Sequence, residues 1–270
     1  MGQSLEPLDA GPEPVTNVPV AWAHLHPTGP LVVRVGSAAD VTACRGIELA
    51  RLVWIETPLH LAEEAFPEGA PLDVVVAEPA RDAAGLYALT RIRDRHPVRV
   101  TIAGRPGIAR AARIAMALQF PVRLLVRQPS PDVLAELDGA IDLYLHDSQT
   151  AAPVEFLQSA LAWWLHGDAP PPWIALEVDP SRFPRVADDG EPGDVSQPRP
   201  DPDFVARHFA RLIEDRTECA TCRYGGWCLG FFKWPDPSYR CEGVVRLLAR
   251  LEESAAQLAR DLDEARAREP

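Results

Sequence analysis

The stretch VRVTIAGRPGIARAARIAMALQFPVRLLV, residues 98–126, contains one complete structural repeat. Residues 98–102 and 122–126 are short runs of β-branched and aliphatic residues, which are typical of buried strands. Between them, residues 108–118 repeat their apolar positions with helical spacing. A strand, a helix and a second strand in this order predict a right-handed βαβ unit whose two strands are parallel.

The same alternation extends to both sides of this repeat. Further strand-like runs lie at residues 31–35, 52–55, 73–77, 141–145 and 173–178, and helical spacing recurs at 83–95, 130–137 and 153–165. Strands that alternate with helices predict a parallel sheet. We therefore expect an α/β fold, a partial TIM-like (β/α) barrel of six or seven strands, with an open doubly wound sheet as the alternative.

Bulk composition limits the class of protein. The chain has 270 residues, 47% of them hydrophobic, and a formal net charge of −12. The negative charge and the lack of a basic block disfavour a nucleic-acid partner. No apolar run reaches the roughly 18 residues that a membrane-spanning helix needs. Because the first residues do not resemble a secretory signal, we expect a cytoplasmic protein whose cysteines are reduced.

Composition also divides the chain into four parts. Residues 1–17 are rich in Pro, Gly and acidic residues and predict a disordered leader, followed by the βα-repeat at residues 18–184. Residues 185–202 combine many Pro, Gly and Asp residues, which predicts a linker or mobile loop. Residues 203–270 predict a small cysteine-rich module that starts with an amphipathic helix and ends with a helix at 242–268.

The predicted terminal helix carries an apolar seam whose positions are alternately three and four residues apart. Its members are Leu248, Leu251, Ala255, Leu258, Leu262 and Ala265. Such a seam packs either on the protein's own core or on a partner helix. We favour packing on the protein itself, because six positions are few for a self-standing coiled coil.

Four of the five cysteines lie in residues 219–241, CATCRYGGWCLGFFKWPDPSYRC. Their spacing is Cys219-x2-Cys222-x5-Cys228-x12-Cys241. Two cysteines separated by two residues can present both sulfurs to one metal centre from a single turn, and the glycines and aromatic residues that follow allow tight turns and exclude water. The pattern favours a [4Fe–4S] cluster bound by all four cysteines. Structural zinc and disulfides are the alternatives, although zinc more often uses two CxxC pairs and disulfides need an oxidising compartment.

The CxxC-x5-C pattern followed by a distant cysteine resembles the SPASM domain, which carries auxiliary [4Fe–4S] clusters in radical S-adenosylmethionine (SAM) enzymes that modify peptides and proteins. The resemblance covers residues 219–241 only. SPASM domains usually have a further cysteine four residues after the third one, for a second cluster, and Phe232 occupies that position here. The resemblance therefore implies one cluster, with Trp227 and Trp234 shielding it.

The chain departs from radical SAM enzymes in its repeat region. These enzymes need a CxxxCxxC motif after the first barrel strand, but Cys44 is followed by Glu48 and Arg51 at the corresponding positions. We interpret Cys44 as a small buried residue. The resemblance thus implies a stand-alone SPASM protein of the kind found in GeoRSP-type systems. Such a protein would transfer electrons to or from a radical SAM enzyme, or would hold a peptide substrate, peptide chaperone or partner near the cluster.

Two other interpretations are kept open. The first is a scaffold protein without redox activity, stabilised by zinc at the same four cysteines. The second is a barrel enzyme with a structural cluster, which would act through acids and histidines that follow predicted strands, where barrel active sites lie. These candidates are Glu56, Glu78 and Asp147, with His60 and His146. Residues 104–107, Gly-Arg-Pro-Gly, lack the spacing of a phosphate loop and predict an ordinary turn.

Overall fold

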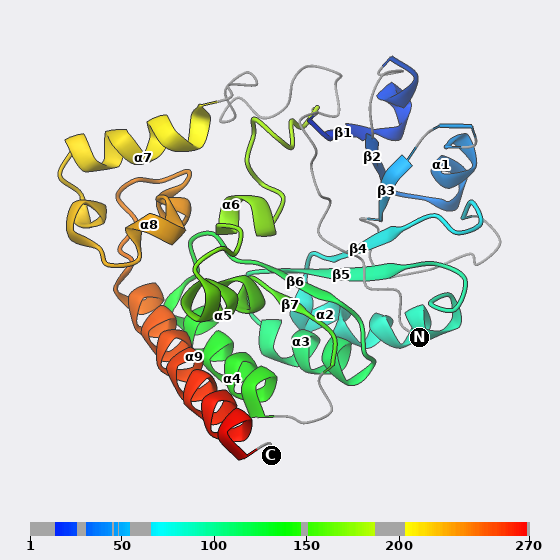
Figure 1. Cartoon of the computed structure of the whole chain (residues 1–270). Helices are drawn as coiled ribbons and strands as arrows, with labels where there is room; N and C mark the ends of the chain where they lie inside the picture. The colour runs from blue at the N-terminus through cyan, green and yellow to red at the C-terminus, as the bar shows by residue number, and fades with distance from the viewer. Residues whose placement is uncertain are drawn as a thin grey trace.

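The computed structural model describes residues 14–25, 31–44, 46–47, 49–54, 66–146, 151–186 and 203–268. The described part of the chain contains a seven-stranded sheet in which every neighbouring pair of strands is parallel (Figure 1). The strands are β1 (Thr16–Pro19), β2 (Leu31–Val35), β3 (Leu49–Trp54), β4 (Leu72–Val76), β5 (Val98–Ala103), β6 (Val122–Leu125) and β7 (Val154–Glu155). They lie in sequential order, without the reversal that defines a doubly wound sheet.

Helices follow the strands and cover one face of the sheet. They are α1 (Ala38–Ala43), α2 (Pro79–Asp82), η2 (Ala83–Arg91), α3 (Ile108–Ala117), α4 (Pro131–His146) and α5 (Leu157–His166). After α6 (Pro172–Ala175) come α7 (Phe204–Glu214), η3 (Glu218–Thr221), α8 (Gly225–Cys228), η4 (Phe231–Lys233) and α9 (Glu242–Arg268); η1 (Val20–Leu25) lies between β1 and β2. The protein is thus a mixed α/β fold with a parallel sheet, as predicted.

The repeat at residues 98–126 forms the predicted βαβ unit, β5–α3–β6. Val100 and Ile102 of β5 are fully buried, in one apolar cluster with Ala111 and Ala115 of α3. Glu136 of α4 accepts hydrogen bonds from the backbone N–H groups of Gly107 and Ala109 at the start of α3. The carboxylate of Glu136 therefore bonds the free N–H groups at the start of α3 and complements the helix dipole there. Residues 104–107 form a turn, as predicted.

Two predicted strands are wrong. Residues 141–145 belong to α4, because Leu137, Ala140 and Ile141 continue one buried helical face that begins at Val133. Residues 173–178 form α6 and the turn after it, since Pro171 and Pro172 favour the start of a helix and Glu177 has a positive φ of 53°. A short apolar run fits a buried helix as well as a strand, and periodicity alone does not separate them.

Two observed strands were not predicted. β1 begins at Thr16, inside the predicted leader, and is held on its other edge by hydrogen bonds with residues 182–186, far along the chain. β7 has two residues and lies within the segment that was predicted as a helix at 153–165. Residues 14–17 of the predicted disordered leader are thus ordered, and Val15 is buried. Residues 1–13 lie outside the described residues, as do residues 187–202 of the predicted linker at 185–202.

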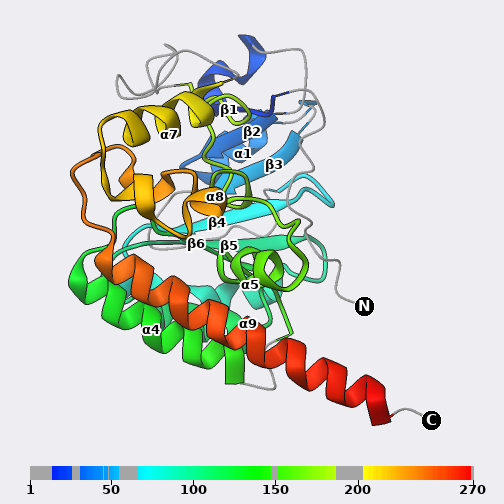
Figure 2. The same cartoon turned by 60° about the vertical axis from the view of Figure 1, so that its left-hand side comes forward.

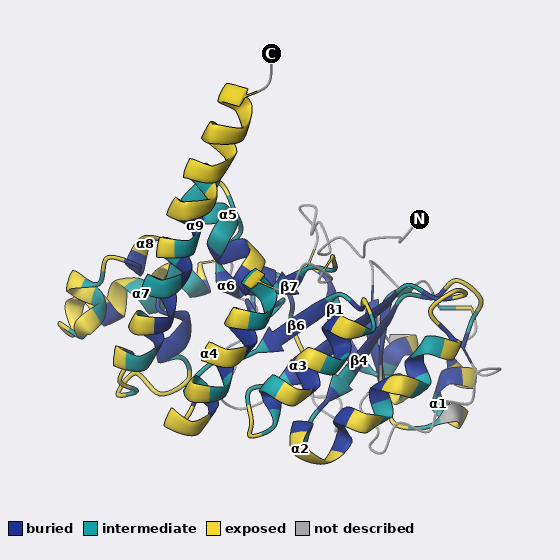
Figure 3. Cartoon of the chain, turned by 90° about the horizontal axis from the view of Figure 1, so that it is seen from below, coloured by how far each residue is buried: buried dark blue, intermediate teal, exposed yellow. Residues whose placement is uncertain are grey.

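The terminal helix α9 begins and ends at the predicted residues. Its first half lies against α4 and α5, with Leu248, Leu251 and Ala255 of the seam buried (Figure 2). Beyond them the helix extends away from the body, and Leu258 and Leu262 are 42% and 43% exposed (Figure 3). The seam therefore packs on the protein itself over its first half only.

The sheet face opposite the helices is charged. Side chains alternate between the two faces of a strand, and this face carries Arg51 of β3, Asp73 of β4, Arg99 of β5 and Arg123 of β6, all buried. Residues 172–186 cross this face. From this crossing segment, Glu177 accepts hydrogen bonds from Arg51, Arg99 and Arg123, each with an N–O distance of 2.7 Å.

The buried carboxylates of this face are stabilised in their charged form. Burial alone would raise the pKa of Glu177, but Arg99 and Arg123 outweigh burial and hold the pKa well below its usual value. In the same way Arg123, Arg99 and Arg51 overcome the burial of Asp73 and lower its pKa to about 2. Both carboxylates are therefore ionised at neutral pH, and Glu177 attaches the crossing segment to three strands.

We expect Glu177→Gln to lower the free energy of unfolding at pH 7 by about 3–5 kcal/mol, because it removes one partner of a buried ionic network. Chemical denaturation would measure this. The matched control is Glu78→Gln, since Glu78 forms an ion pair with Arg105 in which both side chains are about half exposed; we expect it to cost about 0–1 kcal/mol. Equal losses in the two variants would contradict the role assigned to Glu177.

Candidate metal centre

The first two predicted ligands, Cys219 and Cys222, lie on one turn. Helix α7 ends and the chain reverses at Arg216, whose φ is 52°. The hydroxyl of Thr217 then accepts a hydrogen bond from the backbone N–H of Cys219 and begins the 3-10 turn η3. The N–H of Cys222 donates to the carbonyl of Cys219 over 3.3 Å, which closes the turn. The CxxC pair thus has the compact geometry that its spacing predicts.

The third predicted ligand, Cys228, ends the short helix α8. Leu229 and Gly230 follow with φ values of 49° and 74°, so that the chain reverses into η4. A side chain at Gly230 would meet the Cδ1 atom of Leu212 at 2.5 Å. The left-handed conformation favours glycine at this position, and a side chain here would also have to displace the terminal methyl group of Leu212.

The fourth predicted ligand, Cys241, comes directly before α9 and is joined to the first pair by Glu218. The carboxylate of Glu218 accepts a hydrogen bond from the backbone N–H of Cys241 over 2.8 Å. It also forms an ion pair of 2.8 Å with the ammonium of Lys233, whose side chain is only 6% exposed. Glu218 therefore holds together the beginning, the middle and the end of the cysteine segment.

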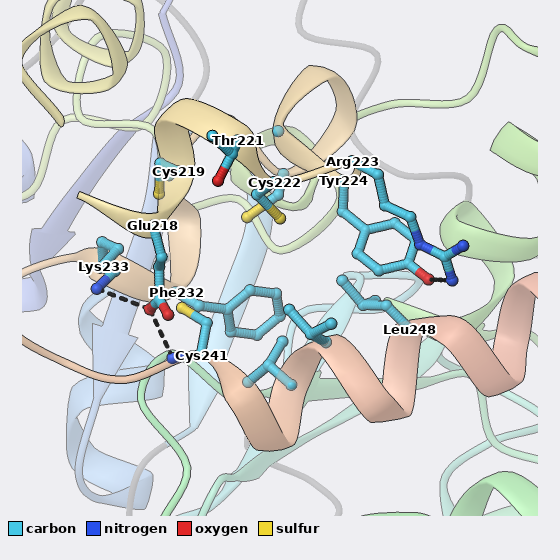
Figure 4. A pocket seen from close by; sticks show the side chains of 15 residues that line it. Glu218, Cys219, Thr221, Cys222, Arg223, Tyr224, Phe232, Lys233, Cys241 and Leu248 are labelled. Atoms are coloured by element: carbon cyan, nitrogen blue, oxygen red, sulfur yellow. Dashed lines mark hydrogen bonds and ion pairs between the residues drawn. The ribbon is translucent and has the colours of Figure 1, made fainter. Parts of the chain in front are cut away.

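All four cysteines line one cavity of about 320 Å3 (Figure 4). Tyr224, Phe232 and Leu248 supply apolar walls, and Glu218 and Lys233 supply a charged one. Each of the five cysteines of the chain is a free thiol, so the disulfide alternative is not observed. Within the described residues, no group of three or more His, Cys, Asp or Glu is placed to hold a single metal ion.

Three of the thiols that line this cavity have a raised pKa. Burial raises the pKa of Cys228 to about 12, although the backbone N–H groups of Phe232 and Phe231 hydrogen-bond to its sulfur and act in the opposite direction. Burial also raises the pKa values of Cys219 and Cys241. These thiols carry their protons at neutral pH. A metal that bound them would displace those protons, so its affinity would rise with pH.

Aromatic side chains join the cysteine segment to the rest of the fold. The indole N–H of Trp173 donates to the carbonyl of Leu229 over 3.1 Å, and its ring meets that of Phe231 edge to face. Trp227 is buried and donates to the carbonyl of Pro170. Neither Trp227 nor Trp234 lines the cavity, so the aromatic walls come from Tyr224 and Phe232 instead of the two expected tryptophans.

Of the other predicted site residues at strand ends, only Glu78 and His146 lie within the described residues. Glu56, His60 and Asp147 lie outside the described residues, as does Glu48. Glu78 pairs with Arg105 at the surface, and His146 is the last residue of α4. Cys44 is buried, its thiol donates to the carbonyl of Asp40, and burial raises its pKa to about 11. It is thus a buried structural residue, as predicted.

Sequence reasoning missed Glu218 and Lys233. Glu218 stands beside Cys219 in the sequence, but nothing in its neighbourhood indicates that it bonds to the N–H of Cys241, 23 positions away. Lysine is almost never fully buried unless it is paired, and its burial here follows from the tertiary contact with Glu218. The only local signal is that both residues lie among the cysteines.

Comparisons with protein-family models, with curated proteins and with solved structures found no match. The resemblance to the SPASM domain therefore stays a prediction that depends on the cysteine pattern. Among the described helices, none combines the length and the apolar character that crossing a bilayer requires.

We expect Gly230→Ala to lower the free energy of unfolding by about 1–2 kcal/mol or more, because alanine would be strained at a φ of 74° and would clash with Leu212. Thermal or chemical unfolding would measure the loss. Gly226→Ala is the control: Gly226 lies in helix α8 and nothing is within 4 Å of an added Cβ atom. That variant should be as stable as the wild type or more so. A neutral Gly230→Ala would contradict the packing described here.

Proposed function

We propose that the chain is an iron–sulfur protein that binds one [4Fe–4S] cluster through Cys219, Cys222, Cys228 and Cys241. The observation that carries this proposal is the convergence of four thiols, separated along the chain and supplied by different structural elements, on one largely apolar cavity. A cubane cluster needs four thiolates placed around it and an apolar shell that limits the access of water.

The dimensions of the cavity favour a cluster over zinc. A single zinc ion binds thiolates at about 2.3 Å, so its four sulfurs close around the ion and leave no space between them. Here the four cysteines, together with eleven other residues, line a cavity of about 320 Å3, which is more space than a single zinc ion occupies. In addition, backbone N–H groups of the following loop hydrogen-bond to the sulfur of Cys228, which is one way in which proteins adjust the potential of a cluster.

The proposed role is accessory to a radical SAM enzyme. With four cysteine ligands no iron would keep an open coordination site, which favours electron transfer over chemistry directly at iron. The alternative within the same proposal is that the protein holds a peptide substrate, a peptide chaperone or a partner close to the cluster. The support for a radical SAM partner is the similarity of the cysteine spacing to the SPASM domain. The chain itself lacks the CxxxCxxC motif of radical SAM enzymes, since Glu48 and Arg51 follow Cys44 at the corresponding positions, so the radical chemistry would have to come from a partner.

We also propose that the sheet forms the wall of a partial TIM-like barrel. Its strands are parallel and in sequential order, and its helices pack on one face, as in a barrel. The opposite face, which would be the barrel interior, holds the buried charges around Glu177. This proposal concerns architecture alone and is independent of the metal centre.

Metal analysis after anaerobic purification tests the cluster. We expect about four iron atoms and four sulfides per chain, from the stoichiometry of the cubane, with a broad visible absorption that dithionite bleaches. Cys228→Ala should lose most of the iron, whereas Cys44→Ala, which removes a buried thiol far from the cavity in sequence, should keep it. If the wild type contains one zinc per chain and keeps it after reconstitution with iron and sulfide, the cluster proposal is wrong and the zinc-stabilised scaffold is the better interpretation.

The Lys233–Glu218 pair gives a prediction about potential. Lys233 places a buried positive charge at the cavity, and Glu218 places a negative one there. Reduction adds negative charge to the cluster, so Lys233→Met should shift the midpoint potential to more negative values and Glu218→Gln to more positive values, each on the order of tens of millivolts. Redox titration followed by EPR would measure both shifts, and Lys233→Arg, which keeps the charge, is the control. Shifts of the same sign in Lys233→Met and Glu218→Gln would contradict this electrostatic role.

A further inference from the structure

The second half of helix α9 carries exposed apolar side chains. The seam of this helix is buried as far as Ala255, whereas Leu258 and Leu262, which continue the same seam, are 42% and 43% exposed. The described residues contain two other exposed large hydrophobic side chains, Tyr87 and Ile213, and these lie on separate elements. Leu258 and Leu262 therefore form a small apolar patch on one face of α9, because residues four apart in a helix are neighbours.

This half of α9 extends away from the body of the protein (Figure 2, Figure 3). Every residue from Arg260 to Arg268 is exposed. The segment that begins at Ala256 is about 13 residues or ~20 Å long, and a helix of this length is marginally stable in water unless it packs on something. Ion pairs within the helix, such as that between Arg268 and Glu264 over 3.2 Å, contribute little at an exposed surface. Burial of the apolar patch would stabilise the segment more.

We propose that the second half of α9 binds the same half of α9 from a second copy of this chain, with the two helices antiparallel. Leu258 of each copy then packs beside Leu262 of the other, so that a two-fold axis makes the patch complementary to itself. Along the second half of the seam, the second helix occupies the place that α4 and α5 occupy along the first half. The dimer interface thus continues a helix interface that the fold already contains.

The direction of the second helix follows from the position of the body. Helices α4 and α5 lie on the seam side of α9, beside its first half (Figure 2). Two parallel helices would have their first halves at the same level, and both bodies would then need the same space between the helices. In the antiparallel order, the body of each copy lies beyond Arg268 of the other copy. The antiparallel order therefore lets the two seams meet without overlap of the bodies.

Charges beside the seam distinguish the two orders. Glu252 and Arg266 flank the seam on the same side, two heptads apart, and the antiparallel order places Arg266 of each copy beside Glu252 of the other. Glu252 already pairs with Arg223, yet its side chain is 37% exposed and can accept a further partner. On the other flank, Asp261 would face Asp261 of the second copy close to the two-fold axis, which weakens the dimer. A parallel pair would instead place Asp261 beside Arg266, which is favourable.

Sedimentation equilibrium of the full chain, in anaerobic reducing buffer that prevents intermolecular disulfides, tests the proposal. We expect a monomer–dimer equilibrium with a dissociation constant in the micromolar range or higher, because the interface is small. The double variant Leu258→Gln/Leu262→Gln should weaken the dimer at least about 100-fold, since each leucine occurs twice in the symmetric interface. Ala256→Gln is the matched control: Ala256 is exposed on the opposite side of the same helix, and its substitution should leave the dimer unchanged.

Asp261→Asn tests the direction of the helices. It should strengthen the antiparallel dimer by about twofold or more, because it removes a like-charge pair at the axis. A weaker or unchanged dimer in this variant would contradict the antiparallel order. A wild type that stays monomeric at all concentrations, or a double variant that dimerises as well as the wild type, would overturn the proposal. Far-ultraviolet circular dichroism of each variant establishes that the fold is intact, and none of these outcomes depends on the metal centre.

Discussion

The ion pairs of Glu177 are the interaction on which the rest of the arrangement depends. After α5 the chain must return across the charged face of the sheet from the side of β7 to the side of β1. Glu177 holds this crossing segment to β3, β5 and β6, and residues 182–186 then bond to the edge of β1. In the same segment Trp173 packs on Phe231 and bonds to Leu229. One short stretch therefore closes the open face of the sheet, protects its first strand and supports the cysteine segment.

The cysteine site is built on this support. Its four thiols come from a 3-10 turn, the end of a one-turn helix and the residue before α9, and none of these elements is long enough to be stable alone except α9. Two sets of contacts stabilise these short elements. Trp173 packs on Phe231 and donates a hydrogen bond to Leu229, and Glu218 binds the backbone N–H of Cys241 and the ammonium of Lys233. The four cysteines thus lie around one cavity, and burial raises the pKa values of three of their thiols, so that the proposed metal would have to displace protons in order to bind them.

Local patterns were sufficient to predict much of the fold. β2 to β6, helices α3, α7 and α9, and the turn at residues 104–107 follow from periodicity and glycine placement within a few residues of each position. β1 and β7 could not be found in this way, because they are held by partners distant in the sequence and have few apolar residues of their own. The prediction of strands at residues 141–145 and 173–178 was wrong for a related reason. Their apolar residues indicate that the segments are buried, but only packing against the rest of the fold decides whether a buried segment is a helix or a strand. The spacing of the cysteines predicts that they lie near one another, and all four line one cavity. The Glu218–Lys233 pair and the arginine network consist of long-range contacts that leave no local pattern.

The central claim is that the four cysteines hold a cluster and not a single ion. X-ray absorption spectroscopy of the anaerobically purified protein tests it most directly, because it reports both the element and its neighbours. The account predicts an iron spectrum with sulfur neighbours and, in addition, short iron–iron scattering, which arises only when several irons share bridging sulfides. A zinc spectrum with four sulfur neighbours near 2.3 Å and no metal–metal scattering would contradict it.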